Sequence, residues 1–483
     1  MSTLRSAFIR VLGIATISGG AALSAMAQEP TTTAAGALPP IRALGKATAR
    51  STDLLGAVSQ VRALPGGRVL VNDNLGRKVV MFEPGLGSFK VVADTTSATA
   101  NAYSSRAGGL VAYKGDSTLF VDPTSLSMLV IDSKGSITRV MSVPRPNDAA
   151  SLIGGPNGTP AFDAQGRLVY RAPPHLHVEG AGFGGAGGAG GGAGGGAGGG
   201  RGQFQMPTFP DSAAIVRIAL DTRAVDTVAW LKIAKQTTTT THTADGGRSV
   251  VSTINPMQIV DDWAVTADGR VAIVRGQDYK IEWIDGKGAV AGSSKIPFAW
   301  RRLNDSMKVA FIDSTKKAME VLRQQAAALA QAGGTASAFA PDPTAGIGGP
   351  PANVRFEFHG AGEEARRPQA ASSNGAPTTG GPNTSQVAQL NFVNPTDLPD
   401  YAPPFAAGAA RSDLNGNVWI RTSNVYNNGS VYDIVNAKGA LTDRVLLPPG
   451  RVIAGFGPGV VYMGYRDGAS VRLEVAPIAS ATP

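Results

Sequence analysis

Residues 268–288 decide the fold, and they read DGRVAIVRGQDYKIEWIDGKG. A turn glycine leads into a first β-prone run, Val271–Ile273, and a second run, Lys280–Ile284, follows after a short connection. Gly286-Lys287-Gly288 then suits a hairpin into a third strand, because glycine adopts positive φ without steric cost. An apolar segment, Ile259–Val265, precedes the stretch. The sequence here therefore predicts a unit of about four antiparallel strands.

The same unit recurs along the chain. Its first part, a turn residue followed by an alternating apolar strand, occurs at Gly67–Val71, Ser117–Val121, Gly166–Tyr170, Gly269–Ile273, Gly416–Ile420 and Gly459–Met463. The second β run follows at Lys78–Phe82, Ser127–Ile131, Ala214–Ala219, Lys280–Ile284, Val431–Val435 and Val471–Val475. Four strands in about 43–50 residues, repeated six times, is typical of the blades of a β-propeller.

These repeats predict an all-β fold, a six-bladed β-propeller with blades over about residues 50–298 and 397–478. The last unit ends after three strands, near Ile478, so closure of the ring needs a strand from the N-terminal part of the chain. Ile41–Ala49 is the candidate. A β-sandwich or two smaller β domains would be the alternative architecture.

Four segments carry a resemblance to a known family. They are residues 268–280, Tyr401–Phe405, Gly416–Arg421 and Gly455–Tyr462. Together with the repeated turn-strand-strand units, these segments resemble NHL-like six-bladed propellers, and in particular exported bacterial propeller proteins of uncharacterised role. The resemblance implies the fold of the blades. It implies no catalytic residue, because the matched segments are blade strands.

The composition excludes several classes of protein. With no cysteine among 483 residues, disulfide scaffolds, zinc ribbons, iron–sulfur sites and thiol nucleophiles are excluded. The formal net charge is +9, but lysines and arginines are scattered along the chain, whereas nucleic-acid binders concentrate them on one helix or stripe. We therefore expect no nucleic-acid partner.

The N-terminus has the pattern of a secretory signal peptide over residues 1–27. Arg5 and Arg10 give a positive start, an acid-free apolar run follows, and Ala25-Met26-Ala27 is a cleavage sequence. Glycines interrupt the run, which is also short for a hydrocarbon layer of about 30 Å, so a membrane anchor is disfavoured. We expect the mature chain, residues 28–483, to be a single periplasmic or secreted propeller domain, a monomer without a transmembrane segment.

Every long excursion falls between the second and third strands of a blade or between two blades. The excursions are a Gly/Ala-rich loop at 180–202, with 16 glycines in 23 residues, a threonine-rich loop at Thr237–Thr243, and an insertion at 299–396 between blades four and five. Within this insertion we expect a helix at about 304–332, from apolar residues at three-and-four spacing, and disorder at 333–386, which is poor in large apolar groups. Such connections share one face of the ring, so the sequence predicts the working surface on that face and at the mouth of the central channel.

The candidate binding residues follow second strands on this face or flank the long insertion. They are Arg275, Asp278, Tyr279, Arg421, Tyr426, Tyr401 and Trp300, because arginine and aromatic side chains anchor anions, sugars or peptide ends. Alternatively, Arg275 pairs with Asp278 and the aromatic rings fill gaps between blades. The four histidines, His175, His177, His242 and His359, all fall in loops and insertions, so we expect no metal site, no cofactor and no catalytic residue.

These patterns favour an exported, non-catalytic propeller that binds an unidentified protein partner or small ligand on its insertion-bearing face. The competing interpretation is an enzyme acting in the central channel, of the lactonase or other hydrolase type or of the lyase type, with or without a metal. A third interpretation is a structural protein of the cell envelope. The sequence leaves the choice between catalysis and binding open.

Overall fold

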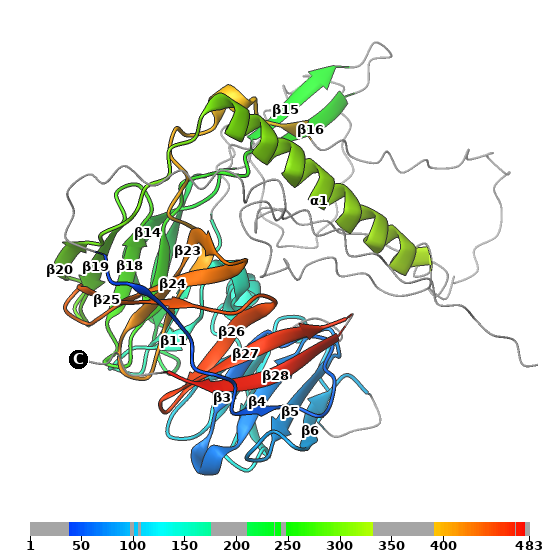
Figure 1. Cartoon of the computed structure of the whole chain (residues 1–483). Coiled ribbons are helices and arrows are strands. Elements are labelled where there is room, and N and C mark those ends of the chain that lie inside the picture. Colours follow the sequence, from blue (N-terminus) through cyan, green and yellow to red (C-terminus); the bar gives the residue numbers. More distant parts are fainter. Residues whose placement is uncertain are drawn as a thin grey trace, which may run out of the picture.

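The computed structural model describes residues 38–96, 101–104, 108–174, 210–235, 237–242, 248–331, 391–468 and 470–478. Its strands form six sheets of four or five strands each, the blades, and one smaller sheet (Figure 1). In each blade the strands are antiparallel neighbours in chain order, from the innermost to the outermost.

The blades have the following strands. Blade one holds β3 (Gln60–Ala63), β4 (Val69–Asp73), β5 (Lys78–Phe82) and β6 (Phe89–Asp94), and blade two holds β7 (Gly109–Ala112), β8 (Thr118–Asp122), β9 (Ser127–Ile131) and β10 (Ile137–Ser142). Blade three holds β11 (Ala161–Phe162), β12 (Leu168–Arg171), β13 (Ser212–Ile218) and β14 (Val225–Lys232), and blade four holds β17 (Asp262–Val265), β18 (Val271–Arg275), β19 (Lys280–Ile284) and β20 (Val290–Lys295). Blade five holds β22 (Phe405–Ser412), β23 (Val418–Tyr426), β24 (Gly429–Val435) and β25 (Leu441–Leu446), and blade six holds β26 (Arg451–Gly457), β27 (Val460–Asp467) and β28 (Ser470–Pro477).

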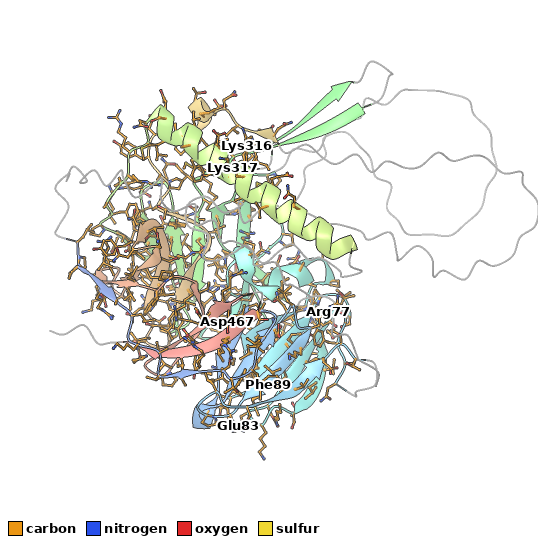
Figure 2. All side chains as sticks on the ribbon, turned by 45° about the vertical axis from the view of Figure 1, so that its right-hand side comes forward. Arg77, Glu83, Phe89, Lys316, Lys317 and Asp467 are labelled. Carbon is orange, nitrogen blue, oxygen red and sulfur yellow. The ribbon has the colours of Figure 1, made fainter. Side chains whose placement is uncertain are left out.

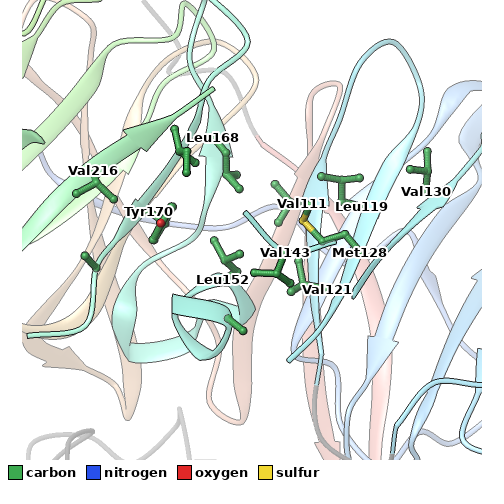
Figure 3. Close-up of a cluster of buried hydrophobic side chains, with 13 residues drawn as sticks. Val111, Leu119, Val121, Met128, Val130, Val143, Leu152, Leu168, Tyr170 and Val216 are labelled. Atoms are coloured by element: carbon green, nitrogen blue, oxygen red, sulfur yellow. The ribbon is translucent and has the colours of Figure 1, made fainter. Parts of the chain in front are cut away.

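Buried apolar side chains between adjacent blades close the ring. Six separate clusters each join one blade to the next, and one of them joins blade six back to blade one. Between blades two and three, Val111, Leu119 and Val121 pack in one cluster with Leu168 and Tyr170 (Figure 3). All six interfaces are therefore filled by described residues, and the sequence-based prediction is confirmed. The chain is a six-bladed β-propeller.

The N-terminal segment completes two blades. β2 (Ala49–Arg50) pairs antiparallel with β28 and is the fourth, outermost strand of blade six. β1 (Ile41–Ala43) runs parallel to β25 and adds a fifth strand to blade five. The predicted closure by Ile41–Ala49 is thus confirmed for its C-terminal end, while its N-terminal end covers the edge of the neighbouring blade instead. Both pairings satisfy backbone groups that an edge strand would leave open.

Tight turns on one face of the ring fix the register of the strands. Asp132, Asp163, Asp285 and Asp413 each accept, through one carboxylate oxygen, the backbone N–H groups two and four positions ahead. The glycine three positions after each of them has φ between +74° and +86°, a conformation in which other residues are strained. We call this side of the ring the short-turn face.

The opposite side, the insertion face, carries a hairpin and a helix. β15 (Thr237–His242) pairs with β16 (Arg248–Ile254), and β21 (Asn391–Phe392) runs parallel to β16. α1 (Asp305–Gln331) confirms the predicted helix, and Figure 1 shows it on the same side of the ring as the hairpin. The prediction of a threonine-rich loop is wrong, because these β-branched residues form strand β15, a conformation that they favour.

Short 3₁₀ segments complete the described structure. They are η2 (Pro65–Gly67), η3 (Pro146–Ile153), η4 (Gly155–Asn157) and η6 (Pro395–Asp397). Helix α1 is held by an apolar cluster made of Met257, Leu303, Ile312, Leu398 and Ala402. No helix in the described ranges is long and apolar enough to cross a membrane. The predicted signal peptide at 1–27, the Gly/Ala-rich loop at 180–202 and the predicted disorder at 333–386 lie outside the described residues.

The two faces lie at opposite ends of the molecule. Glu83, in the β5–β6 turn of the short-turn face, is far from Lys316 and Lys317 of α1 in Figure 2. Each innermost strand runs from the insertion face to the short-turn face, because the connection that follows it is one of the short turns. The end of an innermost strand therefore marks the short-turn side of the channel.

Candidate functional site

The central channel contains a cavity of about 180 Å³ to which all six blades contribute. Its wall is formed by Gln60–Ala63, Leu110, Ala112, Thr159–Ala161, Ala264, Val265, Arg411, Ser412, Leu414 and Ala454–Phe456. Nearly all of these residues belong to the innermost strands or their ends. The propeller fold thus brings together side chains that are up to about four hundred positions apart in the sequence.

The cavity lies towards the short-turn face. The last residues of β3, β7, β17 and β22 are in its wall, and so is Leu414 of the β22–β23 turn, which is 48% exposed. The predicted working surface was the opposite, insertion-bearing face. The notion of a working surface on the insertion face stays a prediction, and the cavity in the channel is a second candidate site.

At the insertion side, backbone segments approach each other across the channel. β22 is irregular between Phe405 and Ala410, and a side-chain carbon added to Gly408 would lie 3.1 Å from the carbonyl oxygen of Gly155. Trp263 also donates its indole N–H to the carbonyl oxygen of Asn157 at 2.9 Å. Blades four and five therefore contact η4 directly.

Two arginines in the cavity wall have no partner. Within the described part of the chain, the guanidinium groups of Arg62 and Arg411 form no hydrogen bond or ion pair, and Nε of Arg62 is fully buried. Burial lowers the pKa of Arg62, an effect that the charge of Asp116 partly offsets. Burial also lowers the pKa of Arg411, Tyr432 raises it, the like charge of Arg421 lowers it further, and Asp262 raises it. A buried cation without a partner is costly, so both side chains are suited to bind an anion.

Gln60 adds a third unpaired donor. Its Oε1 accepts the backbone N–H of Leu110 at 2.7 Å, which fixes the orientation of the amide. Its Nε2 is buried and has no hydrogen-bond partner among the described residues. Gln60 and Arg62 are two positions apart on β3, so their side chains leave the same side of the strand. The wall therefore offers neighbouring N–H donors from an amide and a guanidinium.

The described residues that line the cavity include no carboxylate, histidine or lysine. Asp262 lies next to it, two positions before the lining residue Ala264 on β17, and is 2% exposed. Burial raises the pKa of Asp262 to about 6, although its carboxylate accepts the backbone N–H of Ala410 at 2.9 Å. Because Ala410 precedes Arg411, this hydrogen bond fixes the backbone from which the Arg411 side chain extends.

The sequence-predicted residues of blade four have structural partners. Arg275 forms ion pairs of 2.8 Å with both Asp261 and Glu282, rather than with Asp278. Asp278 lies 3.7 Å from the amino group of Lys280. Tyr279 is fully buried, and its hydroxyl donates to Asp433 of blade five at 2.8 Å. These three residues are therefore held by neighbouring side chains and lie outside the cavity wall.

The other sequence-predicted residues divide between the cavity and the insertion face. Arg421 is close enough to Arg411 for its charge to act on the pKa of that residue. Tyr426, Tyr401 and Trp300 are exposed, at 52%, 49% and 39% respectively, and none of them is in the cavity wall. The structure therefore brings one of the seven candidates near the cavity, and ligand binding by the others stays a prediction.

Sequence reasoning missed Gln60, Arg62, Arg411 and Asp262. The available signal was a charged or amide residue inside the apolar segment before a blade's turn glycine, since that segment becomes the innermost strand. The predicted absence of a metal site drew on histidines that mostly lie outside the described residues. Within the described ranges, no group of three or more histidine or carboxylate side chains could hold a metal ion.

Comparison with known proteins gives similar structures but no family. No protein-family model and no curated protein matches the chain. A gluconolactonase from Xanthomonas campestris is similar over 93% of this chain and 100% of its own, with 9% identity and a TM-score of 0.37. An aldose sugar dehydrogenase from Streptomyces coelicolor, bound to PQQ, is similar over 91% of this chain and 99% of its own, with 10% identity and a TM-score of 0.35. A virginiamycin B lyase from Staphylococcus aureus is similar over 88% of this chain and 83% of its own, with 9% identity and a TM-score of 0.31.

These comparisons correct the expectation of a non-catalytic propeller. The three proteins named above are enzymes by their names. At such low identities the likeness concerns the fold alone. The residues that would act in this chain must therefore be inferred from its own cavity.

Proposed function

We propose that this protein is an enzyme that acts in its central channel on a small anionic substrate. The observation that carries the proposal is the pair of unpartnered, partly buried guanidinium groups, Arg62 and Arg411, in a wall without a carboxylate among the described residues. A carboxylate of the substrate would receive charge-assisted hydrogen bonds from Arg62 and Arg411 and a further hydrogen bond from Nε2 of Gln60.

Arg411 would act on the reacting part of the substrate. Hydrolysis of a lactone or ester, and elimination next to a carboxylate, both develop negative charge on a substrate oxygen. A preorganised cation stabilises this charge and needs no reorganisation. The reaction class that fits the cavity is therefore that of a hydrolase or lyase whose transition state carries an oxyanion.

Asp262 would be a positioning residue. Its ionised carboxylate holds the backbone N–H of Ala410 and attracts the charge of Arg411. Protonation of Asp262 weakens both interactions, so kcat is expected to fall as the pH drops through the pKa of about 6. We further propose that the enzyme acts outside the cytoplasm, which the signal-peptide pattern of residues 1–27 supports.

Turnover measurements test the proposed function. The purified protein is incubated with lactones, esters and hydroxy or acyloxy carboxylates, and products are followed by proton NMR. For any substrate that is turned over, Arg411→Met should lower kcat and also raise KM, Arg62→Met should mainly raise KM, and Asp262→Asn should remove the inflection near pH 6. Turnover that is unchanged in both arginine variants would refute the assignment of the site.

A further inference from the structure

The cavity wall combines unpaired donors with an apolar collar. Five blades each place one alanine in the wall, and these are Ala63, Ala112, Ala161, Ala264 and Ala454. Larger apolar side chains, among them Val61, Leu110, Val265 and Phe456, stand beside them. The polar side chains are confined to Gln60, Arg62, Thr159, Arg411 and Ser412.

The polar groups of the wall are mostly donors. The free hydrogen-bonding atom of Gln60 is an amide nitrogen, and the two guanidinium groups have no acceptor among the described residues. The side-chain acceptors of the wall are the hydroxyl oxygens of Thr159 and Ser412. The hydroxyl of Ser412 already donates to the carbonyl oxygen of Asp413 at 3.1 Å. A ligand rich in hydroxyl groups needs acceptors as well as donors around it, because each buried hydroxyl without a partner lowers affinity. The collar of alanines supplies neither.

We infer that the anion bound in the channel has an apolar body, and is a small aliphatic or aromatic carboxylate rather than a polyhydroxylated acid. This inference rests on the proposed function and names its substrate class. The charged end lies against Gln60, Arg62 and Arg411, and the hydrocarbon part contacts the alanine collar. A cavity of about 180 Å³ is smaller than the pockets of about 300–1,000 Å³ that hold drug-sized ligands, which suits a molecule of the size of benzoate or hexanoate.

The apolar body is tested by calorimetric titration of the full-length protein with benzoate, hexanoate and gluconate. Benzoate and hexanoate are expected to bind at least tenfold more tightly than gluconate, and Arg411→Met should weaken the binding of both at least tenfold. Lys134→Met is the matched control, because Lys134 is an exposed cation in a turn of the same face and is outside the cavity wall. This control should leave all affinities unchanged.

A second variant tests where the hydrocarbon lies. Ala112 is exposed to the channel, so Ala112→Leu would fill part of the cavity without burying a larger side chain in a blade interface. It should weaken benzoate at least tenfold and leave acetate nearly unchanged. Benzoate affinity that is the same in Ala112→Leu would overturn the apolar contact.

The outcomes separate this inference from the proposed function. If gluconate binds as tightly as benzoate and Arg411→Met weakens both at least tenfold, the apolar body is wrong and the anion site stands. If none of the three anions binds, or if their affinities are unchanged in Arg411→Met, both the inference and the proposed function fail.

Discussion

Replacement of Arg411 by methionine should separate function from stability. The methionine side chain is similar in length to that of arginine but carries no charge. Because Arg411 forms no hydrogen bond or ion pair with the described residues, its removal leaves no partner unsatisfied in the wall. A charge-assisted hydrogen bond contributes about 1.5–3 kcal/mol, so the affinity for a carboxylate should fall roughly 10- to 150-fold.

The same change should not weaken the fold. An unsatisfied buried donor costs on the order of 1–3 kcal/mol, and the partial exposure of Arg411 reduces this to about 1 kcal/mol. Arg411→Met is therefore expected to raise the free energy of unfolding by about 1 kcal/mol, which is a gain of about 2 °C in Tm. Affinity is measured by calorimetry, and stability by urea denaturation and thermal melting.

The result that refutes this reasoning is a variant with unchanged anion affinity and a lowered free energy of unfolding. Such a variant would show that Arg411 has a structural partner and no ligand. Arg62→Met is the parallel test in blade one and should show the same combination of lost affinity and retained stability, because the Arg62 guanidinium is also unpaired within the described residues.

Three further predictions concern the stability of the ring. Burial raises the pKa of Asp262 and of Asp433 to about 6 from 3.8, so the folded state holds these protons more tightly than the unfolded chain does. The stability that protonation gives is present below pH 4 and is lost as the pH rises through 6, by up to about 3 kcal/mol for each group. The melting temperature should therefore be lower at pH 7.5 than at pH 5. Asp433→Asn should reduce this difference in melting temperature. Gly416→Ala should lower the free energy of unfolding by about 1–2 kcal/mol, because the φ of Gly416 is +79° but its surroundings are open. Gly269→Ala should lower it clearly more, because the new carbon would lie 2.2 Å from a backbone nitrogen. Equal losses of unfolding free energy in urea denaturation would contradict the packing described here. Deletion of residues 1–50 removes β1 and β2 and uncovers two blade edges. It should therefore lower the midpoint of urea denaturation and promote association in sedimentation measurements. An unchanged midpoint would show that closure of the ring does not depend on this segment.

The repeated units could be predicted from the sequence because each carries its information locally. The second-strand runs Lys78–Phe82, Ser127–Ile131 and Lys280–Ile284 coincide with β5, β9 and β19, since turn residues bound them on both sides. Strand β15 was missed, because six polar residues in succession suggest a loop although threonine favours extended backbone.

The cavity could not be predicted in the same way, because its wall takes one or a few residues from each blade. An isolated arginine such as Arg62 in an apolar strand is a weak signal in the sequence. Its meaning depends on the neighbours that ring closure supplies, above all Gln60 and the alanine collar. The expected insertion-face site followed from a general tendency of long connections, and it stays a prediction.

Crystals of the full-length protein soaked with 4-bromobenzoate test the central claim most directly. The account predicts an anomalous bromine signal inside the channel cavity, with the carboxylate in contact with Arg62 or Arg411 at the short-turn side. A bromine signal on the insertion face, beside Trp300 or Tyr401, together with an empty cavity would contradict it.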